Sequence, residues 1–239
     1  MFNLQLTSFF ISTLFVIFFI DLLLYEEQQG YAPMAPDGRI GGNGASKISL
    51  NGNDYVIVSK SGKLPGQMDY KTDFCLVSKF DTDTWGCDYY SEQPETKPTS
   101  DTPMHYSLLA NVKGAFSALH GHAIEKEDVA RALGVPCSTE ETLFSTPADT
   151  KAMFTLLEEY EYPEWKIFVR KNHGFYILGK DLDECREVLD KQLIAKQTEK
   201  IGKNTTKLKS EKSKRSLTIK KSTKKSTGKP YDLRSKTKT

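Results

Sequence analysis

Residues 166–179 read KIFVRKNHGFYILG, and this stretch decides the class of fold. Its two apolar runs are short and rich in β-branched and aromatic residues, which is typical of strands rather than helices. Strands are therefore predicted at 166–170 and 175–178, on either side of Asn172-His173-Gly174. Strand ends are common places for binding sites in α/β proteins, so His173 is a candidate site residue.

Strands and helices mix along the rest of the chain without a regular strand–helix–strand rhythm. Several consecutive strands favour antiparallel pairing. The sequence therefore predicts an α/β domain whose central sheet is mixed and mostly antiparallel, with helices on both faces. Further strands are predicted at 54–59, 73–78, 84–90 and 114–119, and helices from Asp101 through Leu109, over 127–133, from Thr146 through Leu157 and from Asp181 through Leu189.

The first 25 residues are almost wholly apolar, and residues 9–25 read FFISTLFVIFFIDLLLY. The stretch 4–24 is long enough to cross a hydrocarbon core of about 30 Å. A cleaved signal would need a basic start, but the first basic residue is Arg39. A single-span membrane anchor within the N-terminal segment 1–30 is therefore favoured over a signal peptide or a buried helix. No basic residue flanks the segment closely, so the sequence does not indicate its orientation in a membrane. The protein is expected to be either membrane-anchored with a soluble domain or cytoplasmic.

The C-terminal segment 191–239 is strongly basic. It holds 17 Lys and Arg against 3 Asp and Glu, whereas residues 1–190 hold 16 basic and 28 acidic residues. A segment with so few apolar residues cannot offset its ordering entropy, so a disordered tail is predicted. Its charge suits an anionic partner, either nucleic acid or lipid, and a purely solubilising role is equally open. Tyr231 is its only aromatic residue, which argues against specific base stacking.

The four cysteines show no Cys-x-x-Cys pair and no zinc-ribbon spacing. Buried, reduced thiols are predicted rather than a disulfide framework.

The chain has only four histidines, and three of them are spaced so that one metal ion could collect them. His120 and His122 follow an apolar run, and His173 follows another. Alternate residues of a strand point to opposite faces, so the strand must end or kink here, which Gly121 allows. Three protein ligands leave coordination positions open, as in a catalytic metal site, and Asp101 is the natural carboxylate nearby. The alternative is that these are ordinary core or surface histidines.

Three longer motifs resemble the class II aldolase/adducin family: KPTSDTPMH at 97–105, LHGH at 119–122 and RKNHGFYILGKD at 170–181. Looser likenesses are GGNGAS at 41–46 and VSKSG at 58–62, which resemble two phosphate loops of the family. The motifs occur in the family's order over about 39–190. The resemblance implies a three-layer α/β/α fold for a domain at 31–190.

The resemblance also implies a role for each matching residue. His120, His122 and His173 match the family's metal ligands, usually for zinc, and Asp101 matches its acid/base carboxylate. His105 matches no metal ligand and is interpreted as a helix-surface residue or one that supports the ligands from behind. The substrate phosphate would be held by Asn43, Ser61, Gly62, Thr99 and Ser100.

Some features depart from the family pattern. The loop at 41–46 has an extra residue, and Lys60 replaces a proline. The stretch between His122 and His173 is short, so the second acid/base residue of the family's epimerases has no match. The family's C-terminal tyrosines have none either.

The resemblance predicts a metal-dependent, aldolase-type lyase. Its substrate would be a small hydroxy-carbonyl compound, of which a sugar phosphate is favoured, and the reaction would pass through a metal-stabilised enediolate. An epimerase or dehydratase of a sugar phosphate is one alternative, and a non-enzymatic adducin-like interaction module is another. A homo-oligomer, a tetramer in the family's usual form, is also implied.

Overall fold

A seven-stranded sheet forms the centre of the structure, a computed structural model that describes residues 13–50 and 52–195. The strand order is β4-β3-β2-β1-β5-β7-β6, and every neighbouring pair is antiparallel. The predicted α/β class and mostly antiparallel sheet are confirmed. The strands are β1 Gly42–Leu50, β2 Asn53–Ser59, β3 Phe74–Asp81, β4 Gly86–Ser91, β5 Ser117–Gly121, β6 Ile167–Arg170 and β7 Gly174–Gly179.

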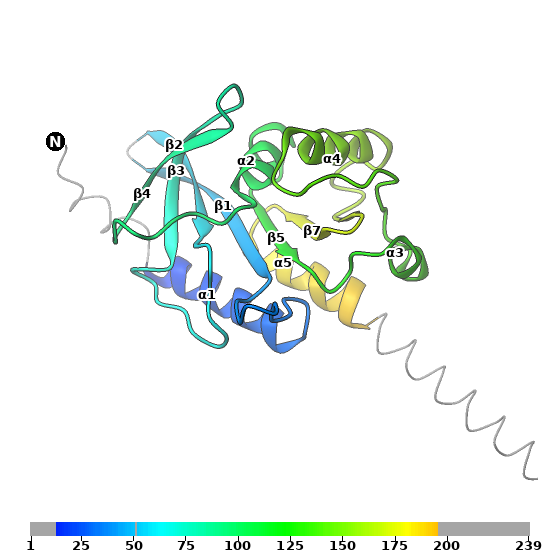
Figure 1. The fold of residues 1–239 in the computed structure, drawn as a ribbon, viewed down its shortest axis with the longest axis horizontal. Coiled ribbons are helices and arrows are strands. Elements are labelled where there is room, and N and C mark those ends of the chain that lie inside the picture. Colours follow the sequence, from blue (N-terminus) through cyan, green and yellow to red (C-terminus); the bar gives the residue numbers. More distant parts are fainter. Residues whose placement is uncertain (1–12, 51, 196–239) are drawn as a thin grey trace, which may run out of the picture. The chain divides into compact units, whose positions relative to one another are not determined.

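Helices cover both faces of the sheet and complete the predicted three layers (Figure 1). In the view of Figure 1, α1 and α5 lie below the sheet, and α2 and α4 lie above it. The helices are α1 Thr13–Gln28, α2 Thr102–Asn111, α3 Glu127–Leu133, α4 Pro147–Glu159 and α5 Leu182–Val188, which continues as the π-helical turn η2 Leu189–Ile194.

Alternate side chains of strand β7 belong to two hydrophobic cores, one on each face of the sheet. Phe175 and Ile177 pack among residues of α1 and α5, whereas Tyr176 and Leu178 pack against α2 and α4. Successive side chains point to opposite faces of a strand, so a strand covered on both sides reads as a continuous apolar run. Cys185 belongs to the core beneath β7, and none of the four cysteines forms a disulfide, as expected.

Helix α1 packs on the sheet through its apolar side chains. Phe19 and Leu22 are fully buried, and the ring of Phe19 lies 5.2 Å from that of Phe74. Among the residues that the structure describes, no helix is both long and apolar enough to cross a membrane. The anchor predicted at 4–24 is therefore not supported, because the apolar side chains of α1 contribute to the core instead. Residues 1–12 of that segment lie outside the described residues.

Residues 41–46, interpreted from the sequence as a phosphate loop, instead belong largely to the central strand β1. Their composition is unfavourable for a strand, but β1 pairs with β2 on one side and β5 on the other. Glycine is needed at Gly44, because a Cβ atom there would lie 2.7 Å from the ring of Phe19. The predicted basic tail lies almost entirely at 196–239, outside the described residues, so its disorder and its anionic partner stay predictions.

Candidate metal centre

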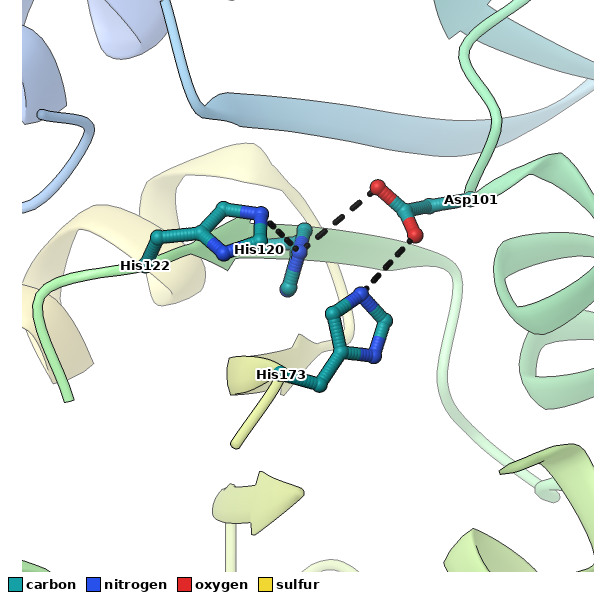
Figure 2. Close-up of side chains that lie close together, drawn as sticks. All are labelled: Asp101, His120, His122 and His173. Atoms are coloured by element: carbon teal, nitrogen blue, oxygen red, sulfur yellow. Dashed lines mark hydrogen bonds and ion pairs between the residues drawn. The ribbon is translucent and has the colours of Figure 1, made fainter. Parts of the chain in front are cut away.

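The predicted metal ligands and Asp101 lie together at one end of the central strands of the sheet. Strand β5 ends there, and β1 and β7, which flank it, both begin there. The first turn of α2 lies at the same end of these strands, with Asp101 as its N-cap residue. This topology brings side chains that are up to 72 positions apart in the sequence into one cluster, Asp101, His120, His122 and His173 (Figure 2).

Each of these four side chains offers one ligand atom, and the four atoms all lie within 4.8 Å of one another. Asp101, His120 and His173 are buried, and His122 is partly exposed. Strand β5 ends at Gly121, so His122 leaves the strand geometry and its ring turns toward that of His120 (Figure 2). The cluster therefore has a buried floor and one side open to solvent.

The hydrogen bonds of His120 and His122 fit a cation between them. Nδ1 of His120 donates to the carbonyl oxygen of Phe175 at 2.8 Å, and Nδ1 of His122 lies 3.2 Å from the carboxylate of Glu125. These partners place both protons on Nδ1 and both lone pairs on Nε2. The two Nε2 atoms nevertheless lie only 3.2 Å apart, and Nε2 of His120 lies 3.6 Å from Oδ2 of Asp101. Lone pairs and a carboxylate at these distances repel unless a proton or a metal cation lies among them.

His120 is suited to act as a neutral ligand. Burial lowers its pKa well below the usual value, and the carboxylate of Asp101 offsets only part of this effect. Uncharged imidazole nitrogens together with a carboxylate form a common ligand set for zinc.

His173 lies between two carboxylates. Its Nε2 is 3.2 Å from Oδ1 of Asp101, and its Nδ1 is 3.1 Å from Oδ2 of Asp149. Burial lowers the pKa of His173, but the two carboxylates outweigh this effect and raise the pKa to about 9. Burial likewise tends to raise the pKa of Asp101, but His120 and His173 outweigh it and hold the pKa below its usual range. Asp101 is therefore a carboxylate, and a bound cation would take the place of the His173 proton.

A chain of hydrogen bonds holds Asp101 from behind. The amide of Asn43 donates to Oδ2 of Asp101 at 2.7 Å, and Nε2 of His105 donates to the amide oxygen of Asn43 at 2.5 Å. The hydroxyl of Tyr176 donates to the other oxygen of Asp101 at 3.4 Å. His105 is fully buried, and burial lowers its pKa to about 4, so it is neutral. Of the two interpretations of His105, the helix-surface one is wrong because the side chain is buried, and the contact with Asn43 agrees with the other, a residue that supports the site from behind.

The residues predicted to hold phosphate fall into two groups. Asn43 is buried, and its amide is already used in the contacts to Asp101 and His105. The others lie on segments 59–62 and 97–100, which run side by side and share backbone hydrogen bonds of 2.9 Å and 3.0 Å. Of the predicted residues on these segments, Thr99 is buried, whereas Ser61, Gly62 and Ser100 are exposed.

The sequence model of the Class II Aldolase and Adducin N-terminal domain matches residues 37–191, which is most of the described part of the chain. The chain belongs to the class II aldolase and adducin family. No curated protein sequence is similar enough to this chain to count as a match.

Solved structures of class II aldolases share the fold at low sequence identity. An L-fuculose 1-phosphate aldolase superposes with a TM-score of 0.53 at 13% identity, covering 78% of this chain and 86% of its own. The L-fuculose-1-phosphate aldolase from Thermus thermophilus gives 0.54 at 14% identity, covering 82% and 96%. A sugar-phosphate aldolase from Thermotoga maritima gives 0.56 at 14% identity, covering 81% and 95%. Such likeness establishes the class II aldolase fold.

Two residues near this class II aldolase site were not identified from the sequence. Asp149, in the first turn of α4, faces His173, and the side chain of Arg170 donates to Asp149 at 2.9 Å. Both are almost completely buried. The capping pattern at Thr146 places Asp149 at a helix start but says nothing about which other segment it meets.

Proposed function

We propose that the chain is a divalent metal-dependent, aldolase-type lyase that acts on a small hydroxy-carbonyl compound, specifically a sugar phosphate. The observation that carries this proposal is the cluster of Asp101, His120, His122 and His173 in a class II aldolase fold. The cluster is partly open on the side of His122, so a substrate can reach it.

The proposed ion is zinc, held by His120, His122 and His173 beside Asp101. When bound, such an ion supplies a Lewis acid that polarises a carbonyl or hydroxyl oxygen of the substrate. Nδ1 of His120 donates to the carbonyl of Phe175, and this bond keeps the Nε2 lone pair directed into the cluster.

Asp101 is the proposed acid/base residue. It is ionised in the resting chain, and its two oxygens meet different partners, Asn43 on one side and Tyr176 with His173 on the other. A carboxylate held in this way can accept a proton from a substrate hydroxyl and return it to the carbon that is left electron-rich when the carbon–carbon bond breaks.

The adjacent segments 59–62 and 97–100 are the proposed phosphate site. Ser61 and Ser100 are exposed and can donate their hydroxyls, and Gly62 exposes its backbone. Hydroxyls and backbone amides at loops and helix starts bind anions well. Thr99 and Asn43 are also proposed for this site, but both are buried, so any contact requires a local rearrangement.

The test combines metal analysis with a substrate screen on the purified chain. We expect a stoichiometric divalent ion and retro-aldol cleavage of one member of a panel of phosphorylated ketoses. His120→Ala and His122→Ala should lose both the ion and the activity. Full activity in metal-free His120→Ala protein would overturn the proposal.

The same screen separates the rival functions. Isomerised sugar without cleavage products would indicate an epimerase, and loss of water would indicate a dehydratase. A chain that binds no divalent ion and turns over no substrate would instead favour an adducin-like interaction module.

A further inference from the structure

Asp149 has no role in the proposed function, yet it is one of the most deeply placed polar groups near the site. Its side chain is 1% exposed, and it lies on the far side of His173 from Asp101. His173 therefore bridges the two carboxylates, Asp101 at Nε2 and Asp149 at Nδ1. A carboxylate buried behind the imidazole ring cannot reach a substrate, which excludes Asp149 as a second acid/base residue.

The two oxygens of Asp149 have different surroundings. Oδ1 accepts hydrogen bonds from Nε of Arg170 at 2.9 Å and from the hydroxyl of Thr142 at 3.0 Å. Arg170 also donates to the hydroxyl of Thr142 at 2.7 Å, which closes a small ring of contacts. This ring holds the carboxylate in one orientation, because the guanidinium is fully buried and its position is set by strand β6.

Oδ2 of Asp149 and Nδ1 of His173 are left facing each other. They lie 3.1 Å apart, and within the described part of the chain neither atom makes a hydrogen bond of good geometry with any group. A buried donor and a buried acceptor without other partners, at hydrogen-bonding distance, are complementary. The arrangement is that of a carboxylate, a histidine and a metal ion in line, in which the carboxylate decides which ring nitrogen keeps its proton.

We infer that Asp149, anchored by Arg170, is the positioning residue for the metal ligand His173. Asp149 accepts the Nδ1 proton of His173, and this leaves the Nε2 lone pair directed toward the cluster. The inference rests on the proposed function only in requiring that the cluster bind a divalent cation. It assigns a task to a residue in the segment between His122 and His173, which is short by comparison with the family pattern.

Asp149→Asn is the variant that isolates this role. Oδ1 accepts two hydrogen bonds, so the amide oxygen of the asparagine takes its place, and the NH2 group then faces His173. Two donors would face each other there. Either the contact breaks, or the proton moves to Nε2, where it blocks the metal. Loss of such a partner typically weakens metal affinity about 10- to 100-fold.

Thr142→Val is the matched control, because it removes a hydrogen bond from Oδ1 of the same carboxylate without touching His173. Zinc affinity would be measured without substrate, by competition with a chromophoric chelator, in the wild-type chain and both variants. Thermal unfolding of each metal-free protein would show that it folds. The Nδ1 proton of His173, observed by nuclear magnetic resonance of the zinc-bound chain, should shift in Asp149→Asn and stay in place in Thr142→Val.

The zinc affinities of the two variants show whether Asp149 positions His173. A loss of zinc affinity in Asp149→Asn, with Thr142→Val within a few-fold of wild type, supports the inference. Equal losses in both folded variants would mean that the loop is merely loosened, and an unchanged affinity in Asp149→Asn would show that Asp149 does not act on His173. Either result overturns the inference but leaves the proposed function standing. If the wild-type chain itself binds no zinc, the proposed function and the inference fail together.

Discussion

The residues around the cluster keep Asp101 ionised and His120 neutral. Asp101 is kept ionised by the protonated His173 on one side and by the amide of Asn43 on the other. His120 is kept neutral by burial. Nε2 of His120 and Oδ2 of Asp101 lie only 3.6 Å apart, yet one group is neutral and the other is charged. Each keeps its protonation state because its own burial and hydrogen-bonding partners differ from those of the other.

Replacement of Asn43 by alanine tests whether this residue serves Asp101 or a substrate phosphate. The amide is bonded to Asp101 and His105, so its removal should mainly lower kcat, by about 10-fold or more. The effect should be similar for phosphorylated and non-phosphorylated substrates. Steady-state kinetics with both substrate types provide the measurement. A rise in KM confined to phosphorylated substrates would instead assign Asn43 to the phosphate.

Glu26 is a second buried carboxyl group, on the opposite face of the sheet from Asp101. It is fully buried, and within the described residues its oxygens have no hydrogen-bond partner. Burial raises its pKa well above 4.5, and Lys63 opposes this only in part. Its contribution to stability is fully present below about pH 4.5, where the folded and unfolded chains both bind the proton. It is lost as the pH rises toward the folded pKa.

Glu26→Gln should therefore become more stable relative to wild type as the pH rises. The difference should grow by up to about 1.4 kcal/mol per pH unit above pH 4.5, until the folded pKa is reached. Urea unfolding of both proteins between pH 5 and pH 8 would measure it, with a chelator present because the metal ligands also titrate. Parallel pH profiles for the two proteins would show that Glu26 is ionised or solvated in the folded chain.

At the scale of elements, α1 and β1 depend on each other. Strand β1 contains Gly44 in the middle of the sheet, and the ring of Phe19 occupies the space that a larger side chain would need. The helix therefore supplies side-chain packing that the strand cannot, through buried side chains such as Phe19 and Leu22.

Phe19→Ala should cost about 3–5 kcal/mol in the free energy of unfolding, because it leaves a cavity between α1 and the sheet. Leu14→Ala, on the same helix but 75% exposed, is the control and should change stability by less than about 0.5 kcal/mol. Chemical denaturation of both variants gives the comparison. Equal and small effects would mean that α1 does not pack on the sheet in solution.

At the scale of the whole molecule, the site lies at a surface that carries apolar side chains. Phe144 is 53% exposed, and its ring lies 5.6 Å from that of His173, while the neighbouring Leu143 is 71% exposed. Isolated apolar side chains are common on protein surfaces. The resemblance to the class II aldolases nevertheless predicts that several copies of the chain assemble.

Light scattering after size-exclusion chromatography should give about four times the mass of one chain, as the family resemblance implies. Dilution below the dissociation range should lower the activity per chain if neighbouring subunits help to form each site. A monomer with full activity at all concentrations would show that one chain is sufficient.

Local patterns in the sequence were sufficient to predict several strands and helices, and the residue types indicated the chemistry of the site. Short apolar runs defined β2, β3, β5, β6 and β7, and capping patterns placed α2 and α4. The spacing of His120, His122 and His173 identified a candidate ligand set because imidazole is scarce in this chain. The predictions of strands and helices need only neighbouring residues, since turns, caps and strand alternation are local properties.

Other features depended on tertiary contacts: the central strand β1, the placement of α1 and the contacts between distant site residues. The tertiary structure made a strand of the glycine-rich residues 42–50, because partners on both sides supply the hydrogen bonds that local propensity does not favour. It turned an apolar N-terminal run into a helix of the core. It also brought His105 to Asn43 and Asp149 to His173, across 62 and 24 positions of sequence. Such contacts depend on how distant segments pack. Burial then sets the protonation state of the side chains and the strength of the contacts between them.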